Sequence, residues 1–263
     1  MEQQSQENVS KRVGEQKRPF ILVVDGETSR QFITSMLLQR LGYHVFTVTT
    51  AEDALMILDL TVPSLLVTEI NLPQMSGLEL MRRLRTVPRT GELPVLIYTT
   101  VKDPAQRAAC VQAGCAGYLV QPAEPNQLYE AVQKATEPTP RHFIRLATSL
   151  DVLVGADGIP GFVVRREKVS ALSENGMYVN TSDPLPYGTV LPFTIFISGE
   201  HKRGGIKVDG KVLYSHQGGD GAVKLPGMGV KFVQIKHEDK ELIKAYIRDK
   251  VLEGLAVSIQ SPR

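Results

Sequence analysis

The chain has 263 residues, of which 42% are hydrophobic and 22% are charged, and its formal net charge is +2. This length favours two domains that each bury a core, and the composition excludes a mainly disordered chain. The near balance of charge gives no indication of nucleic-acid binding. Because the apolar runs are far too short to span a bilayer and the N-terminus is polar rather than signal-like, we expect a cytoplasmic protein without membrane insertion.

The N-terminal half alternates between strand and helix patterns. Residues 1–18 are polar and lack apolar periodicity, which predicts a disordered tail. Residues 19–135 contain five βα units and predict a doubly wound (βα)5 domain around a parallel sheet. One helix is expected at 28–41, with Phe32, Met36, Leu37 and Leu41 on its buried face, and another at 126–135. The strands are expected at 20–24, 44–48, 65–68, 95–99 and 118–120.

The C-terminal half is rich in short β-type runs. Two prolines in residues 136–140 break the preceding helix and predict a linker there. Residues 141–255 predict a six-stranded antiparallel barrel followed by a helix at 239–254, and residues 256–263 form a second tail. Gly210 interrupts one run and predicts a β-bulge. The strands are expected at 151–154, 162–168, 177–180, 190–197, 206–214 and 229–235, and the helical stripe consists of Leu242, Tyr246, Ile247, Val251 and Leu252.

The two cysteines, Cys110 and Cys115, have no histidine or further cysteine near them at ligand spacing. Neither a metal site nor a disulfide framework is therefore predicted. We interpret both as small core residues.

Functional groups in an open parallel sheet cluster at the carboxyl ends of its strands. The residues expected there are Asp25, Gly26, Glu69, Thr99 and Gln121. Their surroundings resemble the signature stretches of a response-regulator receiver domain over about residues 19–135. The resemblance implies transfer of a phosphoryl group onto an aspartate beside Mg²⁺, with a lysine that stabilises the developing charge. The stretches are VVDGE at 23–27, TEINLP at 68–73, PVLIYTT at 94–100 and GYLVQP at 117–122.

Three residues depart from this receiver pattern. Gly26 replaces one of the acidic pair, Glu69 replaces the phosphoacceptor, and Gln121 replaces the lysine. The site then lacks a hard anionic ligand, an in-line nucleophile and a positive charge, so we expect no bound Mg²⁺ and no normal phosphorylation. Two interpretations of Glu69 remain open: it permanently imitates the phosphorylated acid and holds Thr99 and Tyr118 inward, or the pocket is inert.

The C-terminal half carries a second set of motifs. RHFIR at 141–145 is followed by ALSENG at 171–176 and by PGMGVKF at 226–232. This combination is similar to the PilZ family, small barrels that recognise cyclic di-GMP through an RxxxR segment and a (D/N)xSxxG strand motif. The resemblance covers about residues 139–255.

The PilZ resemblance implies that Arg141, Arg145, Ser173 and Gly176 bind the ligand. Paired guanidinium groups suit phosphates and the O6/N7 edge of guanine, and they can stack on the base. Ala171 stands where the family usually has Asp or Asn, which removes one hydrogen-bond partner for the guanine edge. The motif thus retains four of its five expected residues.

These features predict a non-enzymatic, cyclic di-GMP-responsive effector of the response-regulator type. The receiver-like domain is expected to contact a protein partner, for which a second copy of the chain is one candidate, and the family resemblance implies roles in motility or exopolysaccharide regulation. The alternative is a ligand-free adaptor in which both pockets are vestigial, which Ala171 favours. A phosphorylated response regulator is disfavoured by Gly26, Glu69 and Gln121 together.

Overall fold

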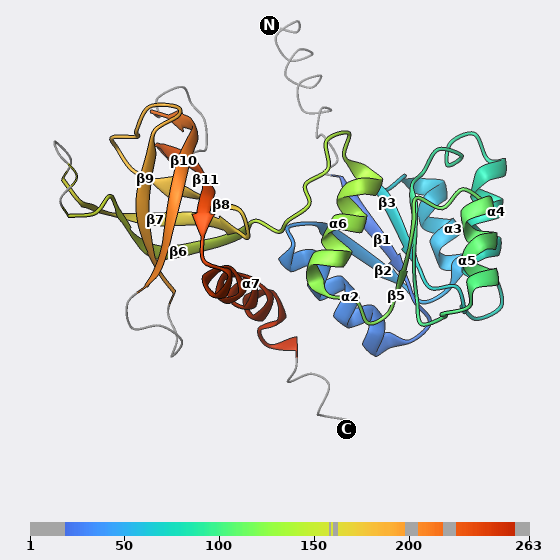
Figure 1. The fold of residues 1–263 in the computed structure, drawn as a ribbon. Coiled ribbons are helices and arrows are strands. Elements are labelled where there is room, and N and C mark those ends of the chain that lie inside the picture. Colours follow the sequence, from blue (N-terminus) through green and yellow to red (C-terminus); the bar gives the residue numbers. More distant parts are fainter. Residues whose placement is uncertain (1–18, 158, 160–162, 198–204, 218–224, 256–263) are drawn as a thin grey trace, which may run out of the picture. The chain divides into compact units, whose positions relative to one another are not determined.

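A computed structural model describes residues 19–157, 159, 163–197, 205–217 and 225–255 of the chain (Figure 1). The predicted tails at 1–18 and 256–263 lie outside these residues. The chain divides into two compact units, residues 1–122 and 123–263. The domain limits expected from sequence, 19–135 and 141–255, remain predictions. Among the described residues, no helix is both long and apolar enough to cross a membrane.

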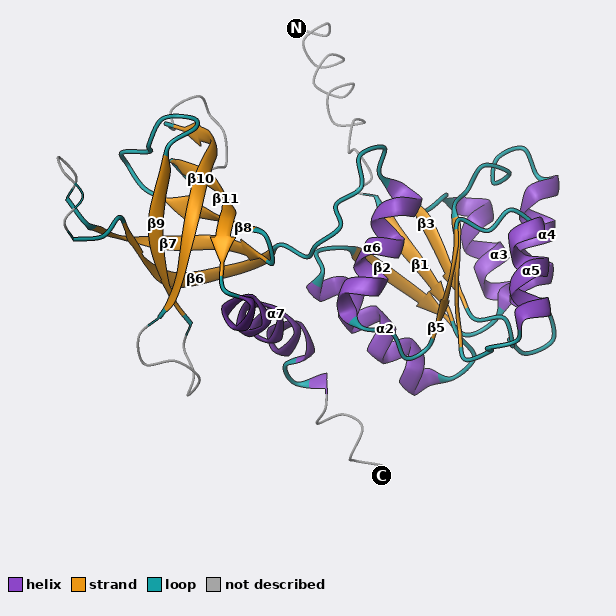
Figure 2. Cartoon of the chain, viewed as in Figure 1, coloured by secondary structure: helices purple, strands orange, loops and turns teal. Residues whose placement is uncertain are grey.

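The first unit is a five-stranded parallel sheet in the order β2-β1-β3-β4-β5 (Figure 2). Strand β1 therefore pairs with both β2 and β3, as in the doubly wound arrangement that the sequence predicts. The predicted strands are confirmed, with β5 one residue longer than expected. The elements are β1 (Phe20–Val24), α2 (Thr28–Arg40), β2 (His44–Val48), α3 (Ala51–Leu60), β3 (Leu65–Thr68), α4 (Gly77–Thr86), β4 (Val95–Thr99), α5 (Pro104–Gln112) and β5 (Gly117–Val120).

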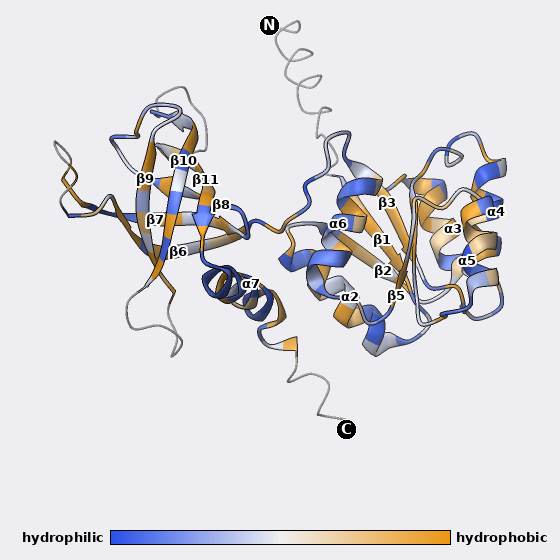
Figure 3. Cartoon of the chain, viewed as in Figure 1, coloured by the Kyte–Doolittle hydropathy of each residue, from blue (hydrophilic) through white to orange (hydrophobic). Residues whose placement is uncertain are grey.

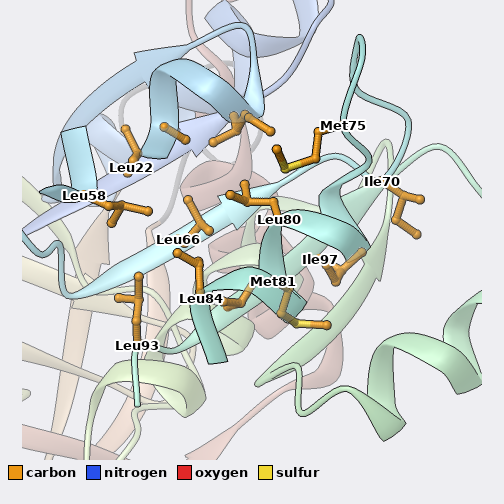
Figure 4. Packing of buried hydrophobic residues seen from close by; sticks show 14 of the residues in the cluster. Leu22, Leu58, Leu66, Ile70, Met75, Leu80, Met81, Leu84, Leu93 and Ile97 are labelled. Carbon is orange, nitrogen blue, oxygen red and sulfur yellow. The ribbon is translucent and has the colours of Figure 1, made fainter. Parts of the chain in front are cut away.

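One layer of the core of this unit lies between the sheet and helices α3, α4 and α5. Figure 4 shows Leu58 of α3 with Leu80 and Leu84 of α4 beside Leu22 and Leu66 of the central strands, and all five are at most 2% exposed. Strands β1, β3 and β4 are buried along their whole length, which explains their apolar sequences. Figure 3 shows β1 and β3 coloured as hydrophobic. Such a core fixes the strand ends at which the polar residues gather.

The predicted buried face of α2 was only partly right, because Leu37 is buried whereas Met36 and Leu41 are half-buried. Phe32 is 48% exposed, whereas the buried residues of the helix include Gln31, Thr34, Leu37 and Leu38. The polar side chain of Gln31 is accommodated on this face by a hydrogen bond, which it donates to the carbonyl of Val48 at 2.6 Å. A pattern based on hydrophobicity alone therefore did not reveal the polar part of the buried face.

The second unit is a closed antiparallel barrel in the order β10-β11-β8-β7-β6-β9. It confirms the predicted six strands, although β6 begins five residues earlier than expected and β7 is displaced toward the C-terminus. Residue 162, where one strand was expected to begin, lies outside the described residues. The elements are α6 (Pro125–Thr136), β6 (Leu146–Val154), β7 (Arg165–Ser173), β8 (Gly176–Asn180), β9 (Val190–Phe196), β10 (Ile206–His216), β11 (Gly227–Ile235) and α7 (His237–Leu252).

The β10–β11 pair has a register shift between Asp209 and Gly210, where the bulge was predicted, but the extra residue is Val233 of β11 rather than Gly210. A Cβ atom at Gly210 would lie 2.4 Å from Cγ1 of Val230, so the close packing of the barrel wall requires glycine here. The predicted stripe of α7 was only partly right. Its buried residues are Asp239, Ile243, Ile247 and Val251, whereas Leu242 and Tyr246 lie at the margin.

Candidate functional sites

The carboxylate of Glu69 is at the centre of a cluster of polar groups at the strand ends of the first unit, where the receiver pocket was expected. Glu69 directly follows β3 and is 1% exposed. Its Oε1 atom accepts the backbone N–H of Ile70 at 2.6 Å, the backbone N–H of Asn71 at 3.2 Å and the hydroxyl of Thr99, while its Oε2 atom accepts the backbone N–H of Thr100 at 3.1 Å. Four donors thus saturate the carboxylate, because both of its oxygens are engaged by the protein itself.

Asp25 directly follows β1 and has a cationic partner that the sequence analysis missed. The guanidinium of Arg30 contacts both carboxylate oxygens of Asp25, with Nη2–Oδ1 at 2.8 Å and Nε–Oδ2 at 3.2 Å. Asp25 is 2% exposed, and its hydrogen bond raises the pKa of Arg30, with smaller electrostatic contributions from Asp25 and Glu69. Arg30 therefore supplies positive charge beside the two acids of the pocket.

Arg30 is held in place by the start of α2. The side chain of Glu27 accepts the backbone N–H groups of Ser29 and Arg30 at 2.9 and 2.8 Å and caps the helix. These two hydrogen bonds lower the pKa of Glu27. A basic residue in the first turn, five positions after Asp25, was the available signal for this ion pair.

Mg²⁺ is the metal that the receiver resemblance implies, and the residues present do not fit it. Both oxygens of Asp25 contact Arg30, and Gly26 offers no side-chain oxygen. A Cβ atom at Gly26 would lie 2.8 Å from Cδ of Pro73, so even a small side chain requires the adjacent loop to move. The described residues contain no cluster of three or more His, Cys, Asp or Glu side chains that could hold a metal ion.

Gln121 does not join the Glu69 cluster. Its side-chain amide donates to the backbone carbonyl of Tyr98 at 2.7 Å and so reinforces the β4–β5 edge. Tyr118 is half-buried, donates its hydroxyl to the carbonyl of Val101 at 2.8 Å, and has a pKa raised mainly by burial. The structure thus brings Glu69 and Thr99 together, whereas Gln121 has a separate structural contact.

The second unit contains a cavity of about 300 Å³. It lies between the segment at residues 141–145, which precedes β6, and the wall formed by β7, β8, β11 and β10. It brings together the four ligand-binding residues expected from sequence. It also includes residues that were not predicted, above all Tyr178 and Tyr214. Its lining residues are Arg141, His142, Phe143, Arg145, Ala171, Leu172, Ser173, Asn175, Gly176, Met177, Tyr178, Leu213, Tyr214, Gly229, Val230 and Lys231.

Arg141 and Arg145 are both exposed, and neither guanidinium has a hydrogen bond or ion pair with another described residue. Lys231 adds a third cationic side chain, and no carboxylate is among the lining residues of the cavity. The cavity is therefore positively charged with unsatisfied donors. Such an arrangement attracts an anion that can accept several hydrogen bonds.

The segment that carries the two arginines is fixed by one face of α6. Asn126 donates its amide to the carbonyl of His142 at 3.2 Å and accepts the backbone N–H of Ile144 at 3.3 Å. The side chain of Gln133 accepts the backbone N–H of Arg141 at 3.2 Å. This anchoring restricts the backbone between the two arginines before any ligand arrives, which reduces the entropy lost on binding.

The strand motif has a structural role as well as a place in the cavity. The Ser173 hydroxyl donates to the carbonyl of Gly176 at 3.0 Å and closes the β7–β8 turn. A Cβ atom at Gly176 would lie 2.4 Å from the carbonyl oxygen of Val230, so this glycine permits close approach of β11. Ala171 reaches the cavity with a methyl group alone, whereas Asn175 in the turn adds an amide that the motif did not predict.

Comparisons with known proteins agree with both resemblances. Residues 21–133 match the response regulator receiver domain, and residues 139–249 match the PilZ domain. The chain is 32% identical to chemotaxis protein CheY1 of Helicobacter pylori over 115 residues, which cover 43% of this chain and 93% of that protein. It is also 32% identical over 114 residues to an uncharacterized 14.6 kDa protein of Leptolyngbya boryana, covering 43% of this chain and 87% of the other.

Longer regulators are matched only in part. The chain is 31% identical over 119 residues to the probable transcriptional regulator ycf27 of Cyanophora paradoxa, which covers 45% of this chain and 48% of that protein. It therefore spans about half the length of this relative. The chain belongs to the response regulator receiver family through residues 21–133, and residues 139–249 add a PilZ domain to it.

Proposed function

We propose that the chain is a non-enzymatic effector of the response-regulator type that responds to cyclic di-GMP. One observation carries the proposal: Arg141 and Arg145 line the same cavity, and neither guanidinium is paired with another described residue. The PilZ match of residues 139–249 supports the choice of ligand, because this family resemblance implies cyclic di-GMP.

The charges in the cavity suit this ligand. Cyclic di-GMP carries two phosphates and two guanines, and a guanidinium can bind a phosphate or the O6/N7 edge of guanine with two parallel hydrogen bonds. Arg141, Arg145 and Lys231 supply positive charge without a competing carboxylate in the lining. The dianion therefore gains charge-assisted hydrogen bonds without breaking an internal ion pair.

Titration calorimetry of cyclic di-GMP into the full-length protein and into Arg141→Ala and Arg145→Ala tests the proposal. We expect micromolar or tighter binding by the unmodified protein and its loss in both variants, because truncation of a charged donor removes about 1.5–3 kcal/mol per bond. Arg166→Ala is the matched control: Arg166 is an exposed arginine on β7 that pairs with Asp151 and does not line the cavity. Equal binding by all four proteins would contradict the proposal.

The alternative is a ligand-free adaptor with two vestigial pockets. Ala171 favours it, because a methyl group cannot hydrogen-bond a guanine edge. The absence of binding heat from the unmodified protein at several temperatures would select the adaptor. Several temperatures are needed because the binding enthalpy changes with temperature and can pass through zero.

The proposal includes a receiver domain that is not phosphorylated in the normal way. The saturated carboxylate of Glu69, the Asp25–Arg30 ion pair and the glycine at position 26 support it. After treatment with acetyl phosphate, we expect no acid-stable, base-labile phosphate on the chain. Such a phosphate would restore the phosphorylated response regulator as the function.

The remaining part of the proposal is an output through protein contact, with a second copy of the chain as the first candidate. Phe46 on the edge strand β2 is 58% exposed and makes an edge-to-face contact with Phe20, with ring centroids 5.0 Å apart. An exposed aromatic side chain on an edge strand supports a contact surface there. Sedimentation velocity of the protein and of Phe46→Asp tests it: the variant should lose any self-association.

A further inference from the structure

Two tyrosines and a glycine form a row across three strands of the barrel. On β11, Gly229 pairs directly with Tyr214 of β10 on one side and with Tyr178 of β8 on the other. Residues directly opposite each other in an antiparallel sheet lie on the same face, so both tyrosines belong to one surface. On β8 this surface is the outer one, because the neighbours of Tyr178 in the strand, Met177 and Val179, are buried.

A β-bulge turns Tyr214 to this outer surface. The pairing of β10 with β11 passes from Val212 opposite Val230 to Tyr214 opposite Gly229, so Leu213 is an extra residue. Val212 is fully buried, and a regular strand would place Tyr214 on the same inner side. The bulge instead leaves Tyr214 46% exposed, next to the arginine-lined cavity.

Gly229 gives the Tyr214 ring its position. A Cβ atom at Gly229 would lie 2.3 Å from Cε1 and Cζ of Tyr214, so the ring extends across the backbone of β11. The Tyr178 and Tyr214 rings are 6.2 Å apart with an interplanar angle of 32°. Tyr178 is held further by its hydroxyl, which donates to the carbonyl of Leu225 at 3.0 Å. The rings and the glycine between them form an aromatic surface, here called the tyrosine platform (Tyr178, Gly229 and Tyr214).

The tyrosine platform and the arginines contribute to the same cavity but offer different chemistry. The guanidinium groups of Arg141 and Arg145 supply charge, whereas the platform supplies apolar ring faces. A purine base stacks on an aromatic ring, and this interaction contributes binding energy without a hydrogen bond to the base edge. We propose that the tyrosine platform binds one purine base of the cyclic dinucleotide by stacking, while the arginines bind its phosphates.

The proposal rests on the function proposed above and explains how the site can operate with Ala171. Ala171 of β7 pairs directly with Tyr178, so the position that lacks a polar side chain is adjacent to the platform. The small methyl group leaves the space beside the Tyr178 ring open. Stacking on the face of the base then compensates for part of the binding energy that is lost with the hydrogen bond to its edge.

Affinity measurements on Tyr214 variants of the full-length protein test the platform. Tyr214→Leu should weaken binding of cyclic di-GMP by roughly fivefold to a hundredfold, the usual range for loss of one stacked base. Tyr214→Phe keeps the ring and should retain nearly the full affinity. Tyr187→Leu is the matched control, because Tyr187 is 74% exposed and does not line the cavity. Thermal unfolding of each variant without ligand shows whether the fold is intact.

Tyrosine fluorescence gives a readout that a purely structural role of Tyr214 would not change. The chain has no tryptophan, so its emission comes from eight tyrosines. Stacking of a base on Tyr214 should quench part of this emission, and the quenching should diminish in Tyr214→Phe although the affinity persists. Unchanged affinity of a folded Tyr214→Leu, with binding still dependent on Arg141 and Arg145, would overturn the platform alone. Failure of the unmodified protein to bind cyclic di-GMP would overturn the proposed function itself.

Discussion

Each unit of the molecule has a candidate site with several polar groups, and the two sites differ in whether those groups are already satisfied. In the first unit, Glu69 accepts four hydrogen bonds and Asp25 is paired with Arg30. In the second unit, the guanidinium groups of Arg141 and Arg145 have no partner among the described residues. One pocket is therefore complete without a ligand, and the other has charge that a ligand can neutralise.

In the first unit, Arg30 provides an internal cation for Asp25, and the Glu69 carboxylate bonds the surrounding amides, so these polar groups are part of the core. Such a pocket stabilises the fold because all its buried donors have acceptors. The arginines of the barrel cavity are instead exposed to solvent. Their charges are hydrated there, so they cost the fold little free energy and remain available for binding.

The largest expected effect is on the saturated pocket. Glu69→Ala removes the acceptor of three backbone N–H groups and of the Thr99 hydroxyl. We expect a loss of about 3 kcal/mol in the stability of the receiver unit, because buried donors are left unsatisfied, and a fall of about 10 °C in its Tm. Differential scanning calorimetry of the full chain measures it. The exposed Glu79→Ala is the control, with an expected change below about 0.5 kcal/mol.

A second change attempts to restore the missing acid. Gly26→Asp should not create a Mg²⁺ site, since Asp25 remains paired with Arg30 and the new Cβ would lie 2.8 Å from Cδ of Pro73. The steric conflict should destabilise the unit by about 1–2 kcal/mol, because the exposed loop can relax only in part. Thermal unfolding with and without Mg²⁺ is the measurement. A rise in Tm that depends on Mg²⁺ would show that the first site can bind a metal ion, and the two sites would then not differ as described.

A third change adds a polar group to the open pocket. Ala171→Asn should strengthen cyclic di-GMP binding about fivefold, or about 1 kcal/mol, because an amide at this position can hydrogen-bond a guanine edge. Titration calorimetry measures it. Ala156→Asn is the control, since Ala156 is exposed and lines a different hollow of the barrel. Weaker binding by Ala171→Asn would instead indicate that the space beside Tyr178 is needed by the base.

The smallest expected effect is on the anchoring of the arginine segment. Asn126→Ala removes two hydrogen bonds, to the carbonyl of His142 and from the backbone N–H of Ile144. Hydrogen exchange at the Ile144 amide should accelerate, and cyclic di-GMP affinity should fall about twofold, or about 0.5 kcal/mol, because the segment must then be ordered on binding. Gln112→Ala, an exposed position on α5, is the control. Unchanged exchange at Ile144 would contradict the anchoring role.

Several features of the fold could be predicted because their signals are local. The runs at Phe20–Val24 and Leu65–Thr68 are continuous and apolar, as strands buried on both faces require. Gly210 indicated the position of an irregularity correctly, because glycine in a strand often marks a bulge or a close approach. The face of α2 was predicted only in part, because polar residues such as Gln31 share it, and Gln31 is buried through hydrogen bonds that no hydrophobic pattern reveals.

The candidate sites were predictable only in part, for a related reason. Arg141 and Arg145 are four residues apart, and the RxxxR motif specifies this spacing directly. The contact between Arg30 and Asp25 depends on the angle at which α2 leaves β1, and the motif does not specify it. Tyr178 and Tyr214 are 36 positions apart in the chain (214 minus 178) and meet only because both pair with Gly229.

The sequence by itself determined the two fold types, the strand ends where the polar residues gather, and the three positions that depart from the receiver pattern. These depend on residue type and short spacing, which periodicity and motifs capture. Only the tertiary structure decided which polar groups are satisfied: Glu69 and Asp25 have partners, whereas Arg141 and Arg145 have none among the described residues. A charged group is paired only if atoms from distant parts of the chain lie close to it in space. Strand register and helix orientation fix the positions of those atoms.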